Sequence, residues 1–577
     1  MKSVLEAERP YFTPFHDNDR VPLPTVPLAL KMSCVTKKIP LLIPILLICA
    51  LLSGLYLPVY SDEVVTKFNI SRFFFEDGKM LSFFPQCTTT VGHDVSWLFY
   101  PAAIIVSTLY EYLHPLGLRV SGILSAMVWF ALLAHWCIKQ SKDNWIERFT
   151  FFSALASLGV LPYLWVLSRP EQFMLVPIMI FCLTALYPPS TKNIIKQLLI
   201  LIALSALTSV FFYAHPKSIF FTPFFIIAGW ACTRNLRTVI KISFLIFVIL
   251  LSIQTLRDAN LLSLCQDAPS VQAVLGMHSL TPGDLLRDPI SFMKIAGRNI
   301  LDFPDRMLIH LVFNPTFQSG WLPPITHTSP FITLLNLLIH YSLLLLVLGS
   351  HTTAMGTALI LASRQRISTP VLLSALLAGG DLINLTLYKA QSFYAGIQYV
   401  PISIVIVLLL LQGLSAQRKK ALSSNAKYTI KLSLFGLSLT SLITLFYLVT
   451  PNILRIADFP TASIPSQPLS IPVLGAEEHL VSISELGERC HIPVDAAEHL
   501  VVDHMTYFAY LKSHNPIHIL YVSQYFGQDL ANGKLLPFLK ERHSSGLITR
   551  CEWVPKEFQN IQLENERGYC CVNFDME

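Results

Sequence analysis

The sequence predicts a polytopic α-helical membrane protein that carries a small α/β domain at its C-terminal end. Of the 577 residues, 53% are apolar and only 14% are charged, against about 25% charged in soluble proteins. The mean hydropathy is +0.54. After residue 450 the long apolar runs give way to short runs of strand length. This composition excludes a soluble globular protein, and the small net charge of +6 gives no indication of a nucleic-acid partner.

About eleven apolar segments are long enough to cross a membrane as helices. A spanning helix needs roughly 20 mostly apolar residues, because the hydrocarbon core is about 30 Å thick and a helix rises about 1.5 Å per residue. The segments are residues 39–59, 117–138, 149–167, 172–188, 197–213, 218–233, 240–256, 328–350, 368–387, 394–413 and 428–450. We expect the eighth to continue past a break to residue 361. Together they predict a membrane domain over residues 39–450.

Basic residues predict the orientation of these segments. Residues 1–38 are polar, end in Lys37-Lys38 and are expected to be a cytoplasmic segment before an uncleaved anchor. Alternate loops are also basic, at residues 139–148, 192–196, 234–241, 364–366 and 418–427. This parity requires residues 97–113 to lie as a helix at the outer interface instead of spanning. We therefore expect a multi-pass protein of a bacterial inner membrane, with long outer loops at residues 60–116 and 257–327.

The outer loop 257–327 is expected to be ordered. It contains weakly amphipathic stretches at residues 289–301 and 304–313, which favour helices packed on a membrane surface over a flexible tether.

Residues 451–577 are expected to form a small α/β domain on the outer, periplasmic side. The strands are expected at residues 498–502, 516–523, 547–553 and 568–574, with helices at residues 504–513 and 529–542 between them. Alternating strands and helices predict a largely parallel sheet. Asp503 follows a strand and precedes a helix, so we interpret it as a helix N-cap and not as a catalyst.

Six of the eleven cysteines fall on the predicted outer side, where disulfides persist. They are Cys87, Cys265, Cys490, Cys551, Cys570 and Cys571. A bridge between Cys87 and Cys265 would join the two long loops, and the alternative is unpaired thiols. The sequence does not decide the pairing among the six.

Polar and charged residues stand at the outer ends of the predicted spans. In chain order they are Asp62 and Glu63 after the first span, Arg119 at the start of the second, Arg169 and Glu171 between the third and fourth, His215 and Lys217 between the fifth and sixth, and Lys389, Gln391 and Tyr394 between the ninth and tenth. Charges at membrane depth are unfavourable, so their gathering at one face indicates a cavity for an anionic head group whose tail stays in lipid.

Transfer of a group from a lipid-phosphate donor requires this set of side chains. A carboxylate accepts the proton of the acceptor, and cations hold the departing phosphate. Asp62 is the candidate base, and Glu63 either holds the acceptor or raises the pKa of the acidic pair. The candidates for binding the phosphate are Lys389, Arg169 and Lys217, with His215 as a hydrogen-bonding group.

Each of these residues has a structural alternative, because acidic pairs often solvate helix ends and single Arg or Lys residues often anchor loops at the interface. The functional interpretation therefore depends on their convergence. His93-Asp94 resembles half of a metal site, but no spaced ligand set completes it.

Several short motifs resemble the C superfamily of glycosyltransferases, which includes protein O-mannosyltransferases and the lipid A aminoarabinose transferase. These motifs are YSDE (60–63), HPLG (114–117), LRVSG (118–122), SRPEQ (168–172), AHPKSIFFTP (214–223) and QSFYAGIQYVP (391–401). The likeness extends in order and spacing over residues 39–410.

The resemblance implies an integral, inverting glycosyltransferase that moves a hexosyl or pentosyl group from a polyprenyl-phosphate-linked donor, with Asp62 as the catalytic residue. The acceptor (lipid, glycan or protein) and the sugar stay open. Residues 87–94 differ from the Lys-Pro or His-Pro-Pro of many relatives. Some branches of the superfamily need a divalent cation and others do not. The sequence shows no ligand set beyond acidic residues, so no cofactor is assigned and a divalent cation remains an alternative.

Two other classes of protein are alternatives: a lipid flippase or secondary transporter, and a noncatalytic membrane assembly subunit. A transporter site is expected near the bilayer midplane, between repeats of the chain. Here the ionisable residues gather at one face, no repeat is visible, and mid-span positions are almost uniformly apolar apart from Asp381 and Asn384. These features favour the glycosyltransferase.

Overall fold

The computed structural model describes residues 39–57, 100–113, 116–263, 279–308, 311–313, 329–388, 396–415, 424–457, 476–493, 499–503, 506–510, 517–518, 537 and 544–574. Apart from Ile39, these residues belong to one compact unit, Pro40–Glu577. Several predictions fall outside the described residues and stay predictions. They concern Asp62, Glu63, Cys87, His93, Asp94, Cys265, Lys389, Gln391, Tyr394 and nearly all of the helix at residues 529–542.

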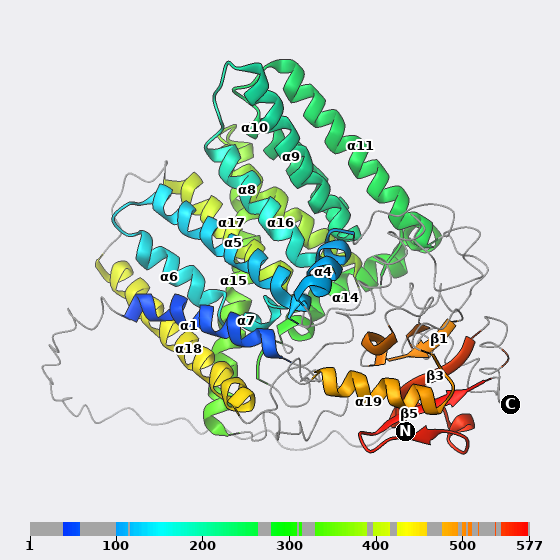
Figure 1. The fold of residues 1–577 in the computed structure, drawn as a ribbon. Coiled ribbons are helices and arrows are strands. Elements are labelled where there is room, and N and C mark those ends of the chain that lie inside the picture. The colour runs from blue at the N-terminus through cyan, green and yellow to red at the C-terminus, as the bar shows by residue number, and fades with distance from the viewer. Residues whose placement is uncertain are drawn as a thin grey trace, which may run out of the picture. The chain divides into compact units, whose positions relative to one another are not determined.

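Long apolar helices build the part of the chain that precedes residue 458 (Figure 1). In chain order they are α1 (Ile39–Ser53), η1 (Gly54–Tyr56), α4 (Tyr100–Leu113), α5 (Gly117–Gln140), α6 (Trp145–Leu155), α7 (Leu161–Leu164), α8 (Pro170–Leu186), α9 (Ile194–Ala214), η3 (Pro216–Phe221), α10 (Thr222–Cys232), α11 (Thr238–Ser263), α13 (Pro282–Arg287), α14 (Pro289–Leu308), α15 (Pro330–Ser363), α16 (Thr369–Leu387), α17 (Gly396–Ser415) and α18 (Ser424–Ala457). Helices α8, α9, α10 and α11 lie beside one another, and α16 packs on both α15 and α17.

Among the described residues, seven helices are long and apolar enough to cross a membrane: α5, α9, α11, α15, α16, α17 and α18. Three shorter apolar helices lie at Leu42–Tyr56, Pro170–Leu186 and Pro216–Cys232. The chain is therefore mostly helical and has the helices of a multi-pass membrane protein. The predicted number of eleven spans is not confirmed.

Two details of the predicted spans are wrong. Residues 149–167 do not form one helix, because α6 ends at Leu155 and the chain bends before α7. At the bend Gly159 adopts a left-handed φ of +59°, which a residue with a Cβ rarely adopts. The break expected near residue 350 is also absent, since α15 is continuous from Pro330 to Ser363. Within this helix, the hydroxyl of Ser350 donates to the carbonyl of Val347 at 3.1 Å.

The bend between α6 and α7 is fixed by a segment that follows α14. The amide of Val160 donates to the carbonyl of Leu311 at 3.0 Å. A Cβ at Gly159 would collide with that same carbonyl. Asn336 of α15 holds the segment in turn, accepting from the Phe313 amide at 2.9 Å and donating to its carbonyl at 2.6 Å. The predicted loop 257–327 contains one amphipathic helix, α14, across residues 289–308, where the sequence analysis expected helical stretches.

The C-terminal part contains a five-stranded sheet in the order β2-β1-β3-β5-β4. The strands are β1 (His499–Val502), β2 (Ile517–His518), β3 (Ser544–Arg550), β4 (Leu563–Glu564) and β5 (Tyr569–Asn573), and helix α19 (Ala476–Arg489) precedes them. β1 pairs in parallel with β2 and β3, but β5 is antiparallel to β3 and β4. The sheet is therefore mixed and not largely parallel.

The four predicted strands correspond to β1, β2, β3 and β5 with differences at their ends, and β4 was not predicted. The predicted strand 547–553 runs instead over Ser544–Arg550 and is followed by the 3₁₀ turn η8 (Cys551–Trp553). In place of the predicted helix 504–513, the described residues show a short 3₁₀ helix, η6 (Thr506–Tyr510). Asp503 caps it, since its Oδ1 accepts from the Thr506 amide at 2.8 Å. Its interpretation as an N-cap is confirmed.

Two disulfides join the sheet to its surroundings. Cys571 pairs with Cys490, at the end of α19, and Cys570 pairs with Cys551 of η8. Successive residues of a strand point to opposite faces of a sheet. Accordingly, Cys571 belongs to the buried cluster that includes α19, and Cys570 to the cluster on the other face. The adjacent cysteines of β5 thus tie down both faces, a pairing that the sequence did not decide.

Candidate anion-binding site at the helix ends

Four of the residues expected to form the site meet around one carboxylate. Glu171, at the start of α8, lies 3.6 Å from Arg169 through its Oε2 and the arginine Nε. Its Oε1 lies 3.5 Å from Lys217 Nζ and 3.7 Å from His215 Nε2. We call these four residues the Glu171 cluster. Two loops that are far apart in the sequence therefore contribute to one group of charges.

The Glu171 cluster is buried and carries an excess of positive charge. The Glu171 side chain is 1% exposed, and those of Lys217, Arg169 and His215 are 8%, 11% and 14% exposed. Two cations face a single carboxylate, which also benefits from its position at the N-terminus of α8. A buried site with one uncompensated positive charge favours binding of an anion.

His215 contributes a neutral imidazole to the cluster. Burial, reinforced by the positive charges of Lys217 and Arg169, lowers its pKa from 6.5 to about 3, although Glu171 acts in the opposite direction. The amide of Lys217 donates to His215 Nδ1 at 3.0 Å, so Nδ1 is an acceptor and the ring proton sits on Nε2. That nitrogen faces Glu171. His215 can therefore act as a hydrogen-bond donor without adding charge.

The chain before α8 is anchored to the start of α5. Ser168 Oγ accepts from the Gly122 amide at 3.0 Å and donates to the Leu118 carbonyl at 3.0 Å. Gln172 donates to the Gly122 carbonyl at 3.0 Å, from the far side of Arg169 and Glu171. A Cβ at Gly122 would collide with the carbonyl of Val166, so only glycine permits this approach. These contacts fix the backbone on which Arg169 and Glu171 stand.

Lys217 is held from a second direction by α16. Its Nζ lies 4.9 Å from the centre of the Tyr388 ring, at the end of that helix, in a cation–π contact. The 3₁₀ turn that carries Lys217 packs closely on α16, because a Cβ at Gly380 would lie 2.7 Å from the Phe221 ring. Burial and contacts on both sides hold Lys217 within the site.

Arg119 contacts the end of the first helical segment. It is buried, and its guanidinium donates to the carbonyls of Gly54, at 3.3 Å, and Leu57. These contacts join η1, the 3₁₀ turn that follows α1, to the start of α5. Asn452 of α18 supports the same end by donating to the Ser53 carbonyl at 2.7 Å. Arg119 thus holds the backbone at Gly54 and Leu57.

The structure also shows a buried polar pair that was not predicted from the sequence. Asp381 of α16 lies 3.1 Å from His351 of α15 and accepts a hydrogen bond from Gln398 of α17 at 2.8 Å. In the sequence, Asp381 stands out as a charged residue among apolar mid-span positions. Its partners lie on two other helices, so they can be identified only from the way α15, α16 and α17 pack together.

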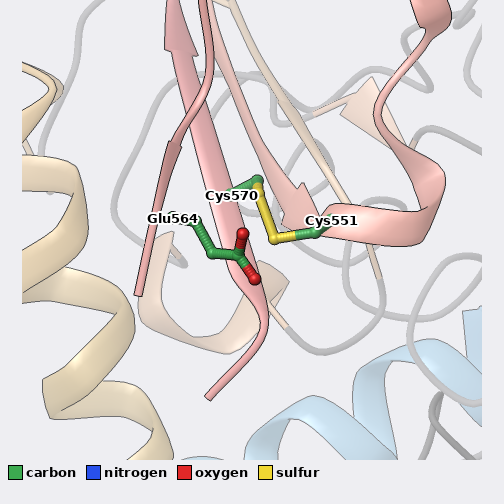
Figure 2. Close-up of side chains that lie close together, drawn as sticks. All are labelled: Cys551, Glu564 and Cys570. Atoms are coloured by element: carbon green, nitrogen blue, oxygen red, sulfur yellow. A yellow bond between two sulfur atoms is a disulfide. The ribbon is translucent and has the colours of Figure 1, made fainter. Parts of the chain in front are cut away.

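A metal site is not established by the described residues. One group there has the composition of a partial metal site: Cys551, Glu564 and Cys570, whose candidate ligand atoms lie within 4.8 Å of one another. Figure 2 shows that the two sulfurs are joined in a disulfide, with the Glu564 carboxylate beside them. Cysteine binds a metal as a thiolate, so this disulfide would first have to be reduced.

The fold and the site define a polytopic membrane protein with a buried, net positive cluster at the ends of its helices. No protein-family model and no curated protein matches the chain. Solved structures of the oligosaccharyltransferase of Archaeoglobus fulgidus do match. One, tethered with an acceptor peptide containing the NVT sequon, is 10% identical, with 89% of this chain and 69% of that chain covered and a TM-score of 0.43.

A second match is archaeal AglB from the same organism in complex with an inhibitory peptide and a dolichol-phosphate. It is 13% identical, with coverages of 90% and 70% and a TM-score of 0.43. A third, the complex with Zn and sulfate, is 12% identical, with coverages of 88% and 68% and a TM-score of 0.42. These enzymes belong to the C superfamily that the sequence motifs resemble.

Lowering the pH should destabilise the wild-type protein more than a His215→Gln variant. The pKa of His215 in the folded protein is about 3, below its usual 6.5, so the unfolded chain binds the extra proton first. The stability contributed by neutral His215 is full above about pH 6.5 and falls as the pH drops toward 3. Apparent melting temperatures of both proteins in detergent across this range measure the effect. An equal loss in both proteins would contradict a buried, neutral His215.

Proposed function

We propose that the protein is an integral-membrane, inverting glycosyltransferase that moves a sugar from a polyprenyl-phosphate-linked donor to an acceptor at the outer face of the membrane. The observation that supports this most strongly is the Glu171 cluster, in which two buried cations share one carboxylate. A phosphate whose hydrocarbon tail stays in lipid matches a positive site at the ends of spanning helices.

The proposed chemistry divides between a base and an anion site. Asp62 accepts the proton of the acceptor hydroxyl as its oxygen attacks the anomeric carbon, and the bond from that carbon to the phosphate oxygen breaks. The bonding electrons leave with the phosphate, which gains negative charge. Lys217 and Arg169 stabilise this charge where it develops, and His215 donates a hydrogen bond. Lys389 is proposed as a further cation for the phosphate, with Glu63, Gln391 and Tyr394 in donor or acceptor binding.

Glu171 is proposed to lower the affinity of the site for phosphate. Without an anion it compensates part of the charge of Lys217 and Arg169, which would otherwise be buried and unpaired. A bound phosphate shares the same cations. The carboxylate therefore weakens binding of the phosphate product and allows it to leave. Arg119 is proposed to act indirectly, by holding the end of the first helix.

The domain arrangement is proposed on the same basis. Residues 1–38 are placed in the cytoplasm, residues 39–450 in the membrane and residues 451–577 on the outer side. The two disulfides support an outer position for the last part, because disulfides persist in oxidising compartments. The donor, the sugar and the acceptor can be identified by mass spectrometry of glycans and glycolipids from cells with and without the gene.

One observation favours the alternative of a secondary transporter. Asp381 and His351 are an ionisable pair within the helices α16 and α15, and such pairs often mark ion or substrate pathways. A transporter moves its substrate without breaking the bond between sugar and phosphate. Detection of free polyprenyl phosphate as a product would therefore distinguish the two functions.

Replacing Lys217 by Gln should weaken binding of a short-chain polyprenyl phosphate by about tenfold or more, since a hydrogen bond to a charged group contributes about 1.5–3 kcal/mol. Binding can be measured with the purified protein in nanodiscs, and polyprenol without phosphate serves as the ligand control. Lys241→Gln is a matched control variant, because Lys241 also lies over an aromatic ring, 5.6 Å from the centre of Trp230. Unchanged affinity in Lys217→Gln would argue against this site for the phosphate.

A further inference from the structure

A second buried carboxylate lies beside the Glu171 cluster, on α16. Asp381 is fully buried, and both of its oxygens are engaged. Oδ1 accepts from Gln398 Nε2 at 2.8 Å, and Oδ2 lies 3.1 Å from His351 Nε2. The carboxylate is thus oriented by two helices, α15 and α17, that do not belong to the loops of the Glu171 cluster.

The His351 ring shows that this pair holds a proton. Its Nδ1 lies 2.7 Å from the carbonyl oxygen of Val347. A carbonyl can only accept, so Nδ1 carries a hydrogen. The contact between Nε2 and Asp381 then needs one more proton, placed either on the imidazole or on the carboxyl group. When the imidazole carries it, Asp381 keeps its negative charge, and the neighbouring imidazolium partly compensates that charge.

Helix α16 packs against the turn that carries Lys217, at the position next to Asp381. Gly380, next to Asp381, would place a Cβ 3.1 Å from the Phe220 carbonyl of that turn. Tyr388, whose ring lies under Lys217 Nζ, is seven residues beyond Asp381 and so shares its face of the helix. Burial lowers the pKa of Lys217, and the negative charges of Glu171 and Asp381 act in the opposite direction.

We infer that Asp381 is a positioning residue of the anion site: held by His351 and Gln398, it keeps Lys217 charged and in place. Glu171 alone is a poor partner for this purpose, because it is shared with Arg169 and His215 and competes with any anion that arrives. Asp381 supplies negative charge from outside the cluster. The ligand named for the site rests on the proposed function, but the relation between Asp381 and Lys217 does not.

Several titratable groups lie on the elements that pack against the turn carrying Lys217, and the test must separate Asp381 from them. The rest of the Glu171 cluster lies at the start of α8 and just after α9. Both α9 and α11 pack on the turn and carry further titratable residues near their ends. They are Glu171 and Arg169 on α8, His215 and Tyr213 at the end of α9, Arg257 and Asp258 on α11, and Asp381 and Tyr388 on α16.

The test is the titration of Lys217 itself. Purified protein in detergent is labelled with an amine-reactive reagent across a range of pH, and the modification of the Lys217 peptide is read by mass spectrometry. In Asp381→Asn the midpoint should fall by about one pH unit or more, because the ammonium form loses a neighbouring negative charge. Asp258→Asn is the matched control, since Asp258 is also a buried helix carboxylate with an amide partner, Gln254 at 3.0 Å.

A second variant keeps the inference testable if Asp381→Asn does not fold. His351→Gln retains the carboxylate and a neutral donor, so the Lys217 midpoint should stay in place or rise. A midpoint that does not move in Asp381→Asn, or that falls equally in His351→Gln, would overturn the inference. The labelling needs neither donor nor acceptor. A shifted midpoint in a protein that transfers no sugar would therefore refute the proposed function and leave this inference standing.

Discussion

Replacing Asp62 by Asn should abolish sugar transfer, with a loss of about 10²- to 10⁴-fold in rate, the usual contribution of a general base. The amide keeps the size of the carboxylate but cannot accept the proton of the acceptor hydroxyl. The anion site is unchanged, so the affinity for polyprenyl phosphate should stay near that of the wild type. Both quantities can be measured on one preparation of protein reconstituted in vesicles, with a radiolabelled donor for transfer and direct titration for binding.

A matched control is Asp77→Asn, an acidic residue of the same outer loop that lies outside the YSDE motif. It should transfer sugar at the wild-type rate. Full activity in Asp62→Asn would remove the catalytic proposal, and it is also the outcome expected of a flippase or of an assembly subunit. Joint loss of transfer and binding would instead point to a structural role for the residue.

The spans could be predicted from the sequence because lipid leaves a membrane segment few alternatives. Backbone groups inside the hydrocarbon core must be satisfied within the segment, so a long apolar run becomes a helix. This explains why α9, α16 and α17 lie close to their predicted positions. It also explains why α15 continues through Gly349 and Ser350, where soluble-protein rules favour a break.

The errors fall where packing between distant segments decides the structure. The bend at Gly159 depends on a contact with the carbonyl of Leu311. The residues next to Gly159 in the sequence do not predict this contact. The pair of Asp381 and His351 depends on the relative rotation of α15 and α16, which hydrophobicity leaves undetermined. By contrast, Arg169 and Lys217 stand in short loops beside spanning helices, and charges at such positions are few enough to be picked out from the sequence.

Replacing Glu171 by Leu should lower the stability of the protein by about 3–5 kcal/mol, the effect expected when one partner of a buried ion pair is removed. The loss comes from Arg169 and Lys217, which would remain buried near each other without a counter-charge. The apparent melting temperature in detergent should fall by several degrees. The effect should be largest in buffers without multivalent anions, since a bound anion can replace the missing carboxylate.

The double variant Glu171→Leu, Lys217→Met distinguishes this charge effect from a packing effect. Removing one of the two uncompensated cations should restore part of the lost stability, so the double variant should melt above Glu171→Leu. Pyrophosphate should raise the melting temperature of Glu171→Leu more than that of the double variant or the wild type, because stabilisation by a ligand follows its affinity for the folded state. If the two substitutions instead add and pyrophosphate acts equally on all three proteins, Glu171 is a packing residue, and the cations around it do not form an anion site.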